Sequence, residues 1–451
     1  MLFSGGPVSA QTHEAPRCAA AAPPVVVSWL RQNAIPLTTT LPGAPSHDLR
    51  PLRRVIGNAR IVGLGESVHG GHEFFEVRHR MLRFLVEEMG FTAFAMETGF
   101  AEAARVNDYV LGRIEEPARW EHNWFTWGFG AEEELQSLVR WMRAYNADPR
   151  HVRKLHFYGV DVPVRYSSPR AAVDGAVGYL MQVDSEFRAS LLRGRLNDLV
   201  SRFKGSGGSD ESRGVSIRKY QALPVEVRDA YTAAVAELIN RFEIKRPDLV
   251  QASTEDRYEW AYRHAIVARQ MDSAFRARGA PNRVEEYNIR DRAISDNTLW
   301  ALAREGSKGR LVLWAHNSHL QKDKLTPEGP DWDVRAPLTR AGEYLASSIG
   351  REYMNVGFSY YDGASTGWMP YLGDNGVGDP AACGSVDAEL DRAGLSMFVI
   401  DLRTARNGPV AHWLSERRPQ RFESSYERLT PSRAWDAILH IRRITPTRRV
   451  R

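Results

Sequence analysis

Residues 60–73 read Arg-Ile-Val-Gly-Leu-Gly-Glu-Ser-Val-His-Gly-Gly-His-Glu. The apolar residues that open this stretch are typical of a short buried strand, and the glycines mark its end. Glu66 and His69 follow, just before a helix pattern begins. Ligands of open α/β sheets bind beyond the carboxyl ends of strands, so the stretch predicts such a sheet, with His69 as a candidate general base at its edge.

Further apolar runs rich in β-branched and aromatic residues predict the other strands of this sheet. With 60–66 as the first, they cover residues 91–97, 154–162, 310–316, 354–361, 397–402 and 437–444. Amphipathic helices are expected at 72–89 and 133–145, where apolar residues recur at three- and four-residue steps. The alternation predicts an α/β fold with a mostly parallel central sheet flanked by helices.

The stretch 164–305 interrupts this alternation and predicts a helical insertion or subdomain. It reads as helices near 185–204, 217–243, 253–278 and 286–305. We therefore expect a disordered N-terminal segment (1–25), a first part of the α/β core (26–163), the insertion (164–305), a second part of the core (306–445) and a basic tail (446–451). The glycine-rich residues 361–385 are expected to form a long loop, a candidate lid.

Composition and charge limit the classes of protein that fit. The net charge is +5, and five arginines within residues 441–451 account for it, so we expect a solvated basic terminus and no nucleic-acid partner. No apolar run reaches the ~20 residues of a membrane span. Cys18 and Cys383 are too few for a disulfide framework or a zinc cluster. We expect a cytoplasmic protein, or an exported one if the true start lies upstream, since residues 7–11 resemble the end of a signal peptide.

Ionisable residues follow four of the predicted strands at their carboxyl ends. They are Glu66 and His69 after the first strand, Glu97 at the end of the second, Asp161 at the end of the third, and His316 and His319 after the fourth along the chain. These ends lie along one edge of a parallel sheet, so we expect the side chains to share a pocket. Burying several ionisable groups together is costly, which favours a functional site over separate structural roles.

Two chemistries use the histidines of such a pocket. In one, His69 is oriented by a carboxylate and deprotonates water, while a second histidine or an arginine stabilises the oxyanion. In the other, a divalent metal is held through the spacings Glu66-x-x-His69, His69-x-x-His72 and His316-x-x-His319, although the His-Glu-x-x-His zinc signature does not occur.

A third chemistry is serine catalysis. Ser365 lies in Gly363-Ala-Ser-Thr-Gly, which matches the G-x-S-x-G pattern, and Asp401 and His412 follow in the order found in α/β hydrolases. The motif needs a helix directly after the serine. Pro370 argues against that helix, so this alternative is the weakest of the three.

Several segments together resemble the erythromycin esterase family. They are Gly-Leu-Gly-Glu66-Ser-Val-His69 with the helix through Arg78, Phe-Ala-Met-Glu97, Trp127, Phe157-Tyr-Gly-Val-Asp161, Tyr287-Asn-Ile-Arg290-Asp and Trp314-Ala-His316-Asn-Ser-His319. They occur in the family order over nearly the whole chain. The resemblance implies an α/β fold with a helical part, and an esterase that opens the lactone ring of 14-membered macrolides by attack of water, without a metal.

The resemblance also implies roles for particular residues. His69 is the base, supported by Glu66, Glu97, Arg78, His316 and His319. We predict that Arg78, His316 and His319 bind the ester oxygens. Helical periodicity alone would turn Arg78 to solvent. Asp161, Trp127 and Arg290 lie in matching segments and are expected to bind substrate, although an aromatic residue at the position of Trp127 more often packs in a core.

We therefore expect a metal-independent carboxylic ester hydrolase acting on a small-molecule ester, with a 14-membered macrolide as the expected substrate. A metal-dependent hydrolase using the same histidines and carboxylates is one alternative. A ligand-binding or polysaccharide-accessory protein that has the pocket without turnover is another.

Overall fold

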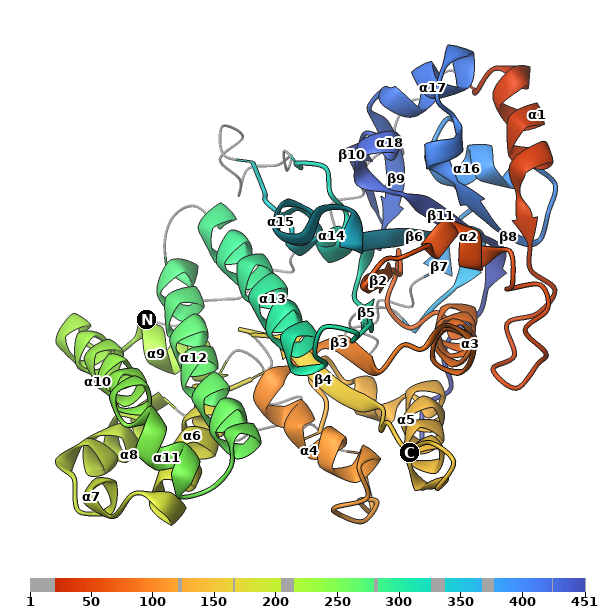
Figure 1. Cartoon of the computed structure of the whole chain (residues 1–451). Coiled ribbons are helices and arrows are strands. Elements are labelled where there is room, and N and C mark those ends of the chain that lie inside the picture. Colours follow the sequence, from red (N-terminus) through yellow and green to blue (C-terminus); the bar gives the residue numbers. More distant parts are fainter. Residues whose placement is uncertain are drawn as a thin grey trace.

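The computed structural model describes residues 21–120, 124–164, 167–203, 215–279, 283–325, 337–366, 377–423 and 425–450, and within them nine strands form one central sheet (Figure 1). Six neighbouring strands are parallel, in the order β11 (Ala437–Ile444), β6 (Tyr353–Ala364), β2 (Ile61–Leu64), β5 (Leu311–Trp314), β3 (Ala93–Gly99) and β4 (His156–Asp161). Three strands are antiparallel to their neighbours: β8 (Met397–Asp401), β1 (Ile35–Pro36) and β7 (Val377–Gly378). The predicted α/β fold with a mostly parallel sheet is confirmed.

Successive residues of the parallel strands point into two separate apolar cores, as expected for a sheet covered on both faces. Val62 and Leu64 of β2 lie in one core, and Ile61 lies in the other. The first core is closed by α2 (Leu52–Ile56), α3 (His72–Met89), α4 (Phe100–Val110) and α5 (Glu133–Ala147). The second is closed by α1 (Pro24–Asn33), α13 (Val284–Arg304), α14 (Asn317–Leu320), α15 (Ala341–Ile349), α16 (Val386–Asp391), α17 (Gly408–Ser415) and α18 (Pro431–Ala434).

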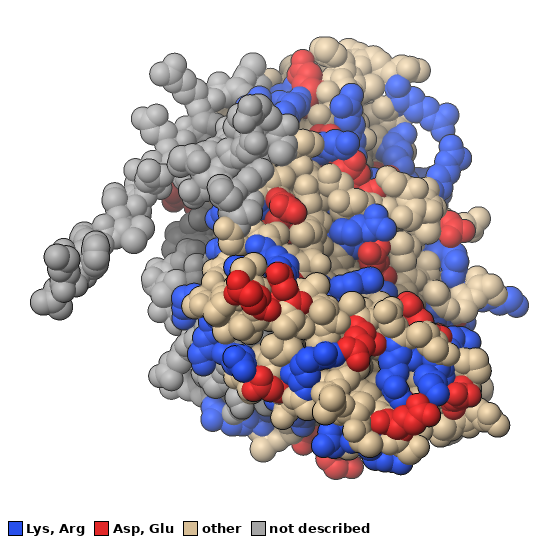
Figure 2. Space-filling model, turned by 90° about the vertical axis from the view of Figure 1, so that its left-hand side faces the viewer, with Lys and Arg blue, Asp and Glu red and all other residues tan. Residues whose placement is uncertain are grey.

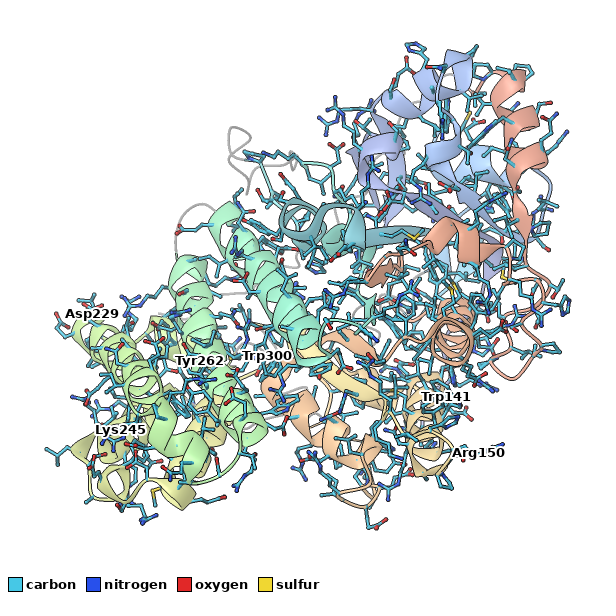
Figure 3. The ribbon with its side chains drawn as sticks, viewed as in Figure 1. Trp141, Arg150, Asp229, Lys245, Tyr262 and Trp300 are labelled. Carbon is cyan, nitrogen blue, oxygen red and sulfur yellow. The ribbon has the colours of Figure 1, made fainter. Side chains whose placement is uncertain are left out.

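The chain between β4 and β5 is helical, as predicted. It forms α6 (Pro169–Val183), α7 (Ser185–Arg188), α8 (Leu191–Phe203), α9 (Val215–Gln221), α10 (Val225–Ile244), α11 (Arg246–Gln251) and α12 (Glu255–Arg278), followed by α13. Helices α6 to α12 enclose their own apolar core and lie to one side of the sheet (Figure 1). Trp300 of α13, labelled in Figure 3, joins the two parts, because its ring contacts Trp260 of α12 and Tyr158 of β4. The exact division at 164 and 305 stays a prediction.

Two predicted segments differ in part from the structure. α1 begins at Pro24, inside the segment 1–25 that was expected to be disordered, while residues 1–20 lie outside the described residues. β6 continues to Ala364, into the predicted loop 361–385, because it pairs with β11 as far as the Gly363 and Ile444 positions. Residues 367–376 of that loop also lie outside the described residues.

Arg442, Arg443, Arg448 and Arg449 of the basic terminus are exposed, as expected for solvated charges, while the backbone around them is held by hydrogen bonds. Arg449 donates hydrogen bonds to Glu132, and the backbone N–H of Thr447 donates to the carbonyl of Gly70 at 3.0 Å. Residues 445–450, which we call the C-terminal strap, thus lie along the segment after β2. On the face shown in Figure 2, basic and acidic side chains are interspersed.

Two further observations concern the described residues alone. None of their helices combines the length and the apolar character that crossing a bilayer requires. Cys383, just before α16, is disulfide-bonded, which the count of two cysteines had not led us to expect.

Candidate active site

The segment after β2 holds a buried ion pair and an imidazole. Glu66 is fully buried, and its two carboxylate oxygens have different partners: Oε1 lies 2.5 Å from Nδ1 of His69, and Oε2 accepts a hydrogen bond of 2.6 Å from Nη2 of Arg78. Arg78 also donates to the carbonyl of Phe74, and its guanidinium lies 3.5 Å from the centre of the Trp314 ring. The carboxylate therefore orients His69 with Nδ1 as the donor, which leaves Nε2 as the free ring nitrogen.

Acidic neighbours set the protonation of this site. Burial alone would lower the pKa of His69, but the negative charges of Glu66, Glu423 and Glu97 outweigh burial and raise it to about 9. Burial alone would likewise raise the pKa of Glu66, but the charges of Arg78 and His69 and the hydrogen bond from His69 together outweigh burial and lower it. The pair Glu66 and His69 is thus held in the charged form at neutral pH.

Arg290 of α13 connects the ends of β3 and β4. Its Nε and Nη2 donate to the two oxygens of Asp161, each at 2.8 Å, and Nη2 also donates to Glu97 at 2.7 Å. Burial would lower the pKa of Arg290, but these carboxylates raise it, so the guanidinium stays charged. The Trp127 indole donates to Asp161 and lies under the guanidinium, and Trp127 itself has a φ of 64°, a rare conformation for a residue with a side chain.

The two histidines after β5 differ in their hydrogen bonding. Nδ1 of His316 accepts a hydrogen bond of 3.2 Å from the backbone N–H of Ser318, so the ring hydrogen belongs on Nε2. That Nε2 is buried and makes no hydrogen bond to the described residues. His319 lies between Asp291, 2.8 Å from Nδ1, and Glu97, 3.2 Å from Nε2. Burial lowers the pKa of His319, but these two carboxylates raise it to about 9.

These groups surround one cavity of about 220 Å³ at the carboxyl edge of the sheet. Its polar lining comes from the strand ends, α13 and the hairpin of β9 (Arg418–Phe422) and β10 (Ser425–Leu429). The lining residues are His69, Glu97, Trp127, Val164, Glu286, Tyr287, Arg290, His316, Ser318, His319, Arg340, Phe422 and Glu423. The strand ends therefore converge as expected from a parallel sheet.

Three predicted site residues lie behind the cavity instead of lining it: Glu66, which contacts His69 from there, Arg78 and Asp161. Arg78 was expected to bind ester oxygens, but it is 1% exposed and its side chain is occupied by Glu66 and the Trp314 ring. Asp161 was expected to bind substrate, but it is fully buried and holds Arg290 and Trp127. The predictions for Arg78 and Asp161 erred because a strand end or helix face does not tell which ionisable group reaches the cavity and which neutralises its neighbour.

The structure does not assemble the serine triad of the sequence analysis. His412 is largely exposed on α17 and lies 3.3 Å from Glu416, while Asp401 pairs with Arg403. Ser365 follows the end of β6. The G-x-S-x-G match is therefore coincidental in this chain.

The residues of the proposed metal-ligand spacings contact different partners. His72 faces Glu134, 2.5 Å away, and Glu76, and so turns away from His69. Among the described residues, no three His, Cys, Asp or Glu side chains are arranged so that they could hold a metal ion.

Four charged residues near the cavity were given no role in the sequence analysis. Asp291 holds His319, Arg340 lies beside Asp291, and Glu286 and Glu423 line the cavity. Asp291 and Glu286 flank the Tyr287-Asn-Ile-Arg290 segment on α13, so a helical projection of that segment could have indicated them. Glu423 comes from a hairpin outside the central sheet, for which the strand-end argument gives no signal.

Comparison with known proteins agrees with the fold. A family model described as erythromycin esterase matches residues 86–444. The chain is 26% identical over 431 residues to erythromycin esterase type II of Escherichia coli, covering 92% of this chain and 96% of that protein. It is 25% identical over 430 residues to the putative hydrolase YbfO of Bacillus subtilis, covering 93% of this chain and 91% of that protein.

Among solved structures, a mutant of the erythromycin esterase EreC in its open conformation has the same fold, with a TM-score of 0.69, 19% identity, and coverage of 91% of this chain and 98% of that chain. The family model spans most of the chain, and the relative from Escherichia coli spans nearly all of it. The chain therefore belongs to the erythromycin esterase family and is an ester hydrolase of that type.

Proposed function

We propose that this protein hydrolyses the lactone ester of a 14-membered macrolide, with His69 as the general base that activates water. The observation that carries the proposal is the free Nε2 of His69, which faces the cavity while Glu66 holds Nδ1 at 2.5 Å. A base oriented in this way needs neither a nucleophilic side chain nor a metal to deliver water to a carbonyl carbon.

The reaction proceeds in two steps. His69 Nε2 takes a proton from water as the water oxygen bonds to the carbonyl carbon, and the carbonyl electron pair moves onto oxygen to form an oxyanion. The ring ester bond then breaks, and the protonated His69 returns its proton to the departing alkoxide. The products are a carboxylic acid and an alcohol within one opened chain.

Two donors are available for the oxyanion. Nε2 of His316 is buried at the cavity and makes no hydrogen bond to the described residues, with Glu423 Oε1 3.3 Å away, and the guanidinium of Arg290 also lines the cavity. Nε and Nη2 of Arg290 are fixed on Asp161 and Glu97, so its charge is held in place before substrate arrives. His319 and Glu97 complete the charged wall, and Arg78 acts by holding Glu66.

Two observations support a macrolide as the substrate. One relative over nearly the full length is named erythromycin esterase type II, and the apolar part of the cavity wall, with Trp127, Val164, Tyr287 and Phe422, suits a large aliphatic ring.

Mass spectrometry of a 14-membered macrolide incubated with the protein tests both points. A product heavier by one water is the expected result. Unchanged mass together with tight binding would instead identify a binding protein, and a parallel panel of aryl esters would reveal an esterase of different specificity.

Two controls separate the chemical alternatives. Turnover that survives exhaustive chelation argues against a metal-dependent hydrolase, and turnover that survives a fluorophosphonate argues against Ser365 as a nucleophile. Loss of activity in either treatment would contradict water activation by His69 alone.

A further inference from the structure

Glu423 is a carboxylate at the cavity that the strand-end pattern does not supply. One oxygen, Oε1, lies 3.8 Å from Nε2 of His69 and 3.3 Å from Nε2 of His316. The same oxygen accepts a hydrogen bond of 3.2 Å from the backbone N–H of His69. The carboxylate therefore lies beside the one ring nitrogen of His69 that Glu66 leaves free.

The hairpin that carries Glu423 is held firmly against the segment after β2. The backbone N–H of Glu423 donates to the carbonyl of Ser67 at 2.7 Å, and Glu423 has a φ of 52°, which is costly for a residue with a side chain. Two residues earlier, the backbone N–H of Arg421 donates to the fully buried Asp387 at 2.7 Å. The Phe422 ring meets the His316 ring edge-on at 4.9 Å.

Because strained conformations persist only where the surroundings enforce them, this anchoring indicates that the position of Glu423 is functional. The 3.8 Å between Oε1 and Nε2 of His69 is too long for a direct hydrogen bond, and a water molecule can bridge groups at such a separation. His316 and Arg290 supply hydrogen-bond donors for the carbonyl oxygen of the substrate. The site still needs an acceptor that orients the attacking water.

We propose that Glu423 is a further catalytic residue, which accepts a hydrogen bond from the water that His69 deprotonates; the proposal rests on the ester hydrolysis proposed above. One hydrogen of the water points to Nε2 of His69 and leaves as a proton, and the other points to Oε1 of Glu423 and stays on the oxygen that bonds to the carbonyl carbon. Glu423 itself gains and loses no proton. Its negative charge also stabilises the imidazolium of His69.

The direct test is Glu423→Gln, which keeps the size of the side chain, the backbone hydrogen bond to Ser67 and an oxygen for the His69 N–H, and removes the charge. Glu416→Gln is the matched control, because Glu416 is exposed at the end of α17. We expect Glu423→Gln to lower kcat roughly 10- to 100-fold with little change in KM and Tm. Glu423→Asp restores the charge and should recover part of the loss.

A pH profile distinguishes this role from a structural one. The charged groups that face His69 are Glu66 with Arg78, Glu97 and Glu423, with His316 alongside. Removing the charge of Glu423 leaves fewer negative groups, so the rising limb of kcat/KM should move to lower pH in Glu423→Gln and stay in place in Glu416→Gln.

The outcomes separate the two proposals. If the wild-type protein hydrolyses the ester and Glu423→Gln does so with kcat within twofold of the wild-type value, the role of Glu423 is overturned. The proposed ester hydrolysis is then unaffected. A lower kcat in Glu423→Gln would also overturn the role of Glu423 if the pH profile of kcat/KM does not shift and Tm falls, because that combination indicates damaged packing. No hydrolysis of any ester by the wild-type protein would overturn both.

Discussion

At the scale of single residues, Arg290 shows how the site fixes the position of a positive charge before substrate binds. Its planar guanidinium bridges the ends of two strands, with Asp161 on one side and Glu97 on the other, and rests on the Trp127 ring. Two carboxylates hold it, so its geometry is fixed without substrate. A lysine has one compact charge and lacks a planar group with several N–H donors, so it cannot make the same set of contacts.

Arg290→Lys is therefore expected to lower kcat/KM by roughly 10- to 100-fold through kcat, because the oxyanion loses a fixed donor. Arg292→Lys is the matched control on the same helix, where Arg292 is exposed and pairs with Asp296. Steady-state kinetics on one ester compares the two variants. Equal activity in both would show that Arg290 only supports the fold.

At the scale of elements, the C-terminal strap holds the segment that carries His69. The carbonyl of Gly70 accepts backbone hydrogen bonds from Thr447 and Thr366, and the backbone N–H of His72 donates to Thr445 at 2.7 Å. Gly70 has a φ of +76°, and a Cβ there would lie 1.8 Å from the Thr366 hydroxyl oxygen, so glycine is required. The position of His69 thus depends on residues more than 370 positions later in the chain.

Thr447→Pro tests the strap, because proline lacks the N–H that bonds to Gly70. We expect kcat to fall roughly tenfold while Tm falls by only a few degrees, since only the backbone and hydroxyl hydrogen bonds of Thr447 are lost and the central sheet is untouched. Thr447→Ala keeps the N–H and serves as the control. A Thr447→Pro variant as active as Thr447→Ala would show that the strap does not position His69.

The elements also show what sequence could and could not predict. Runs such as Ile61–Leu64 and Leu311–Trp314 are apolar throughout, and buried parallel strands need that pattern, so the strands themselves and the convergence of Glu66, Glu97 and His316 could be predicted. The hairpin strands Arg418–Phe422 and Ser425–Leu429 carry charges and Pro419, so they lack a strand signature. Glu423 was missed for that reason, since its place depends on tertiary packing.

At the scale of the whole molecule, the charges of the site should appear in the pH dependence of stability. The pKa values of His69 and His319 are raised from 6.5 to about 9, so their contribution to the free energy of unfolding is complete below pH 6.5 and is lost as pH rises through 9. The pKa values of Glu66, Glu97 and Asp291 are lowered because their cationic partners outweigh burial, so their contribution is lost as pH falls.

We therefore expect Tm to decline by roughly 3–6 °C between pH 6.5 and pH 10 as the two imidazoles lose their protons. Differential scanning calorimetry at a series of pH values measures this. The double variant His69→Gln with His319→Gln removes both titrating groups and should show a flatter profile over the same range. An equal decline in the double variant would assign the effect to other residues.

The pH profile of kcat/KM for ester hydrolysis, measured in the wild-type protein and in His69→Ala, tests the central claim most directly. A base must be unprotonated to accept a proton. We therefore expect kcat/KM of the wild-type protein to rise about tenfold per pH unit and to level off near pH 9, the pKa of His69. His69→Ala should lower the rate by roughly 10²- to 10⁴-fold and abolish the limb, with Tm showing that the fold remains. A variant that turns over near the wild-type rate, or that keeps the same limb, would contradict the account.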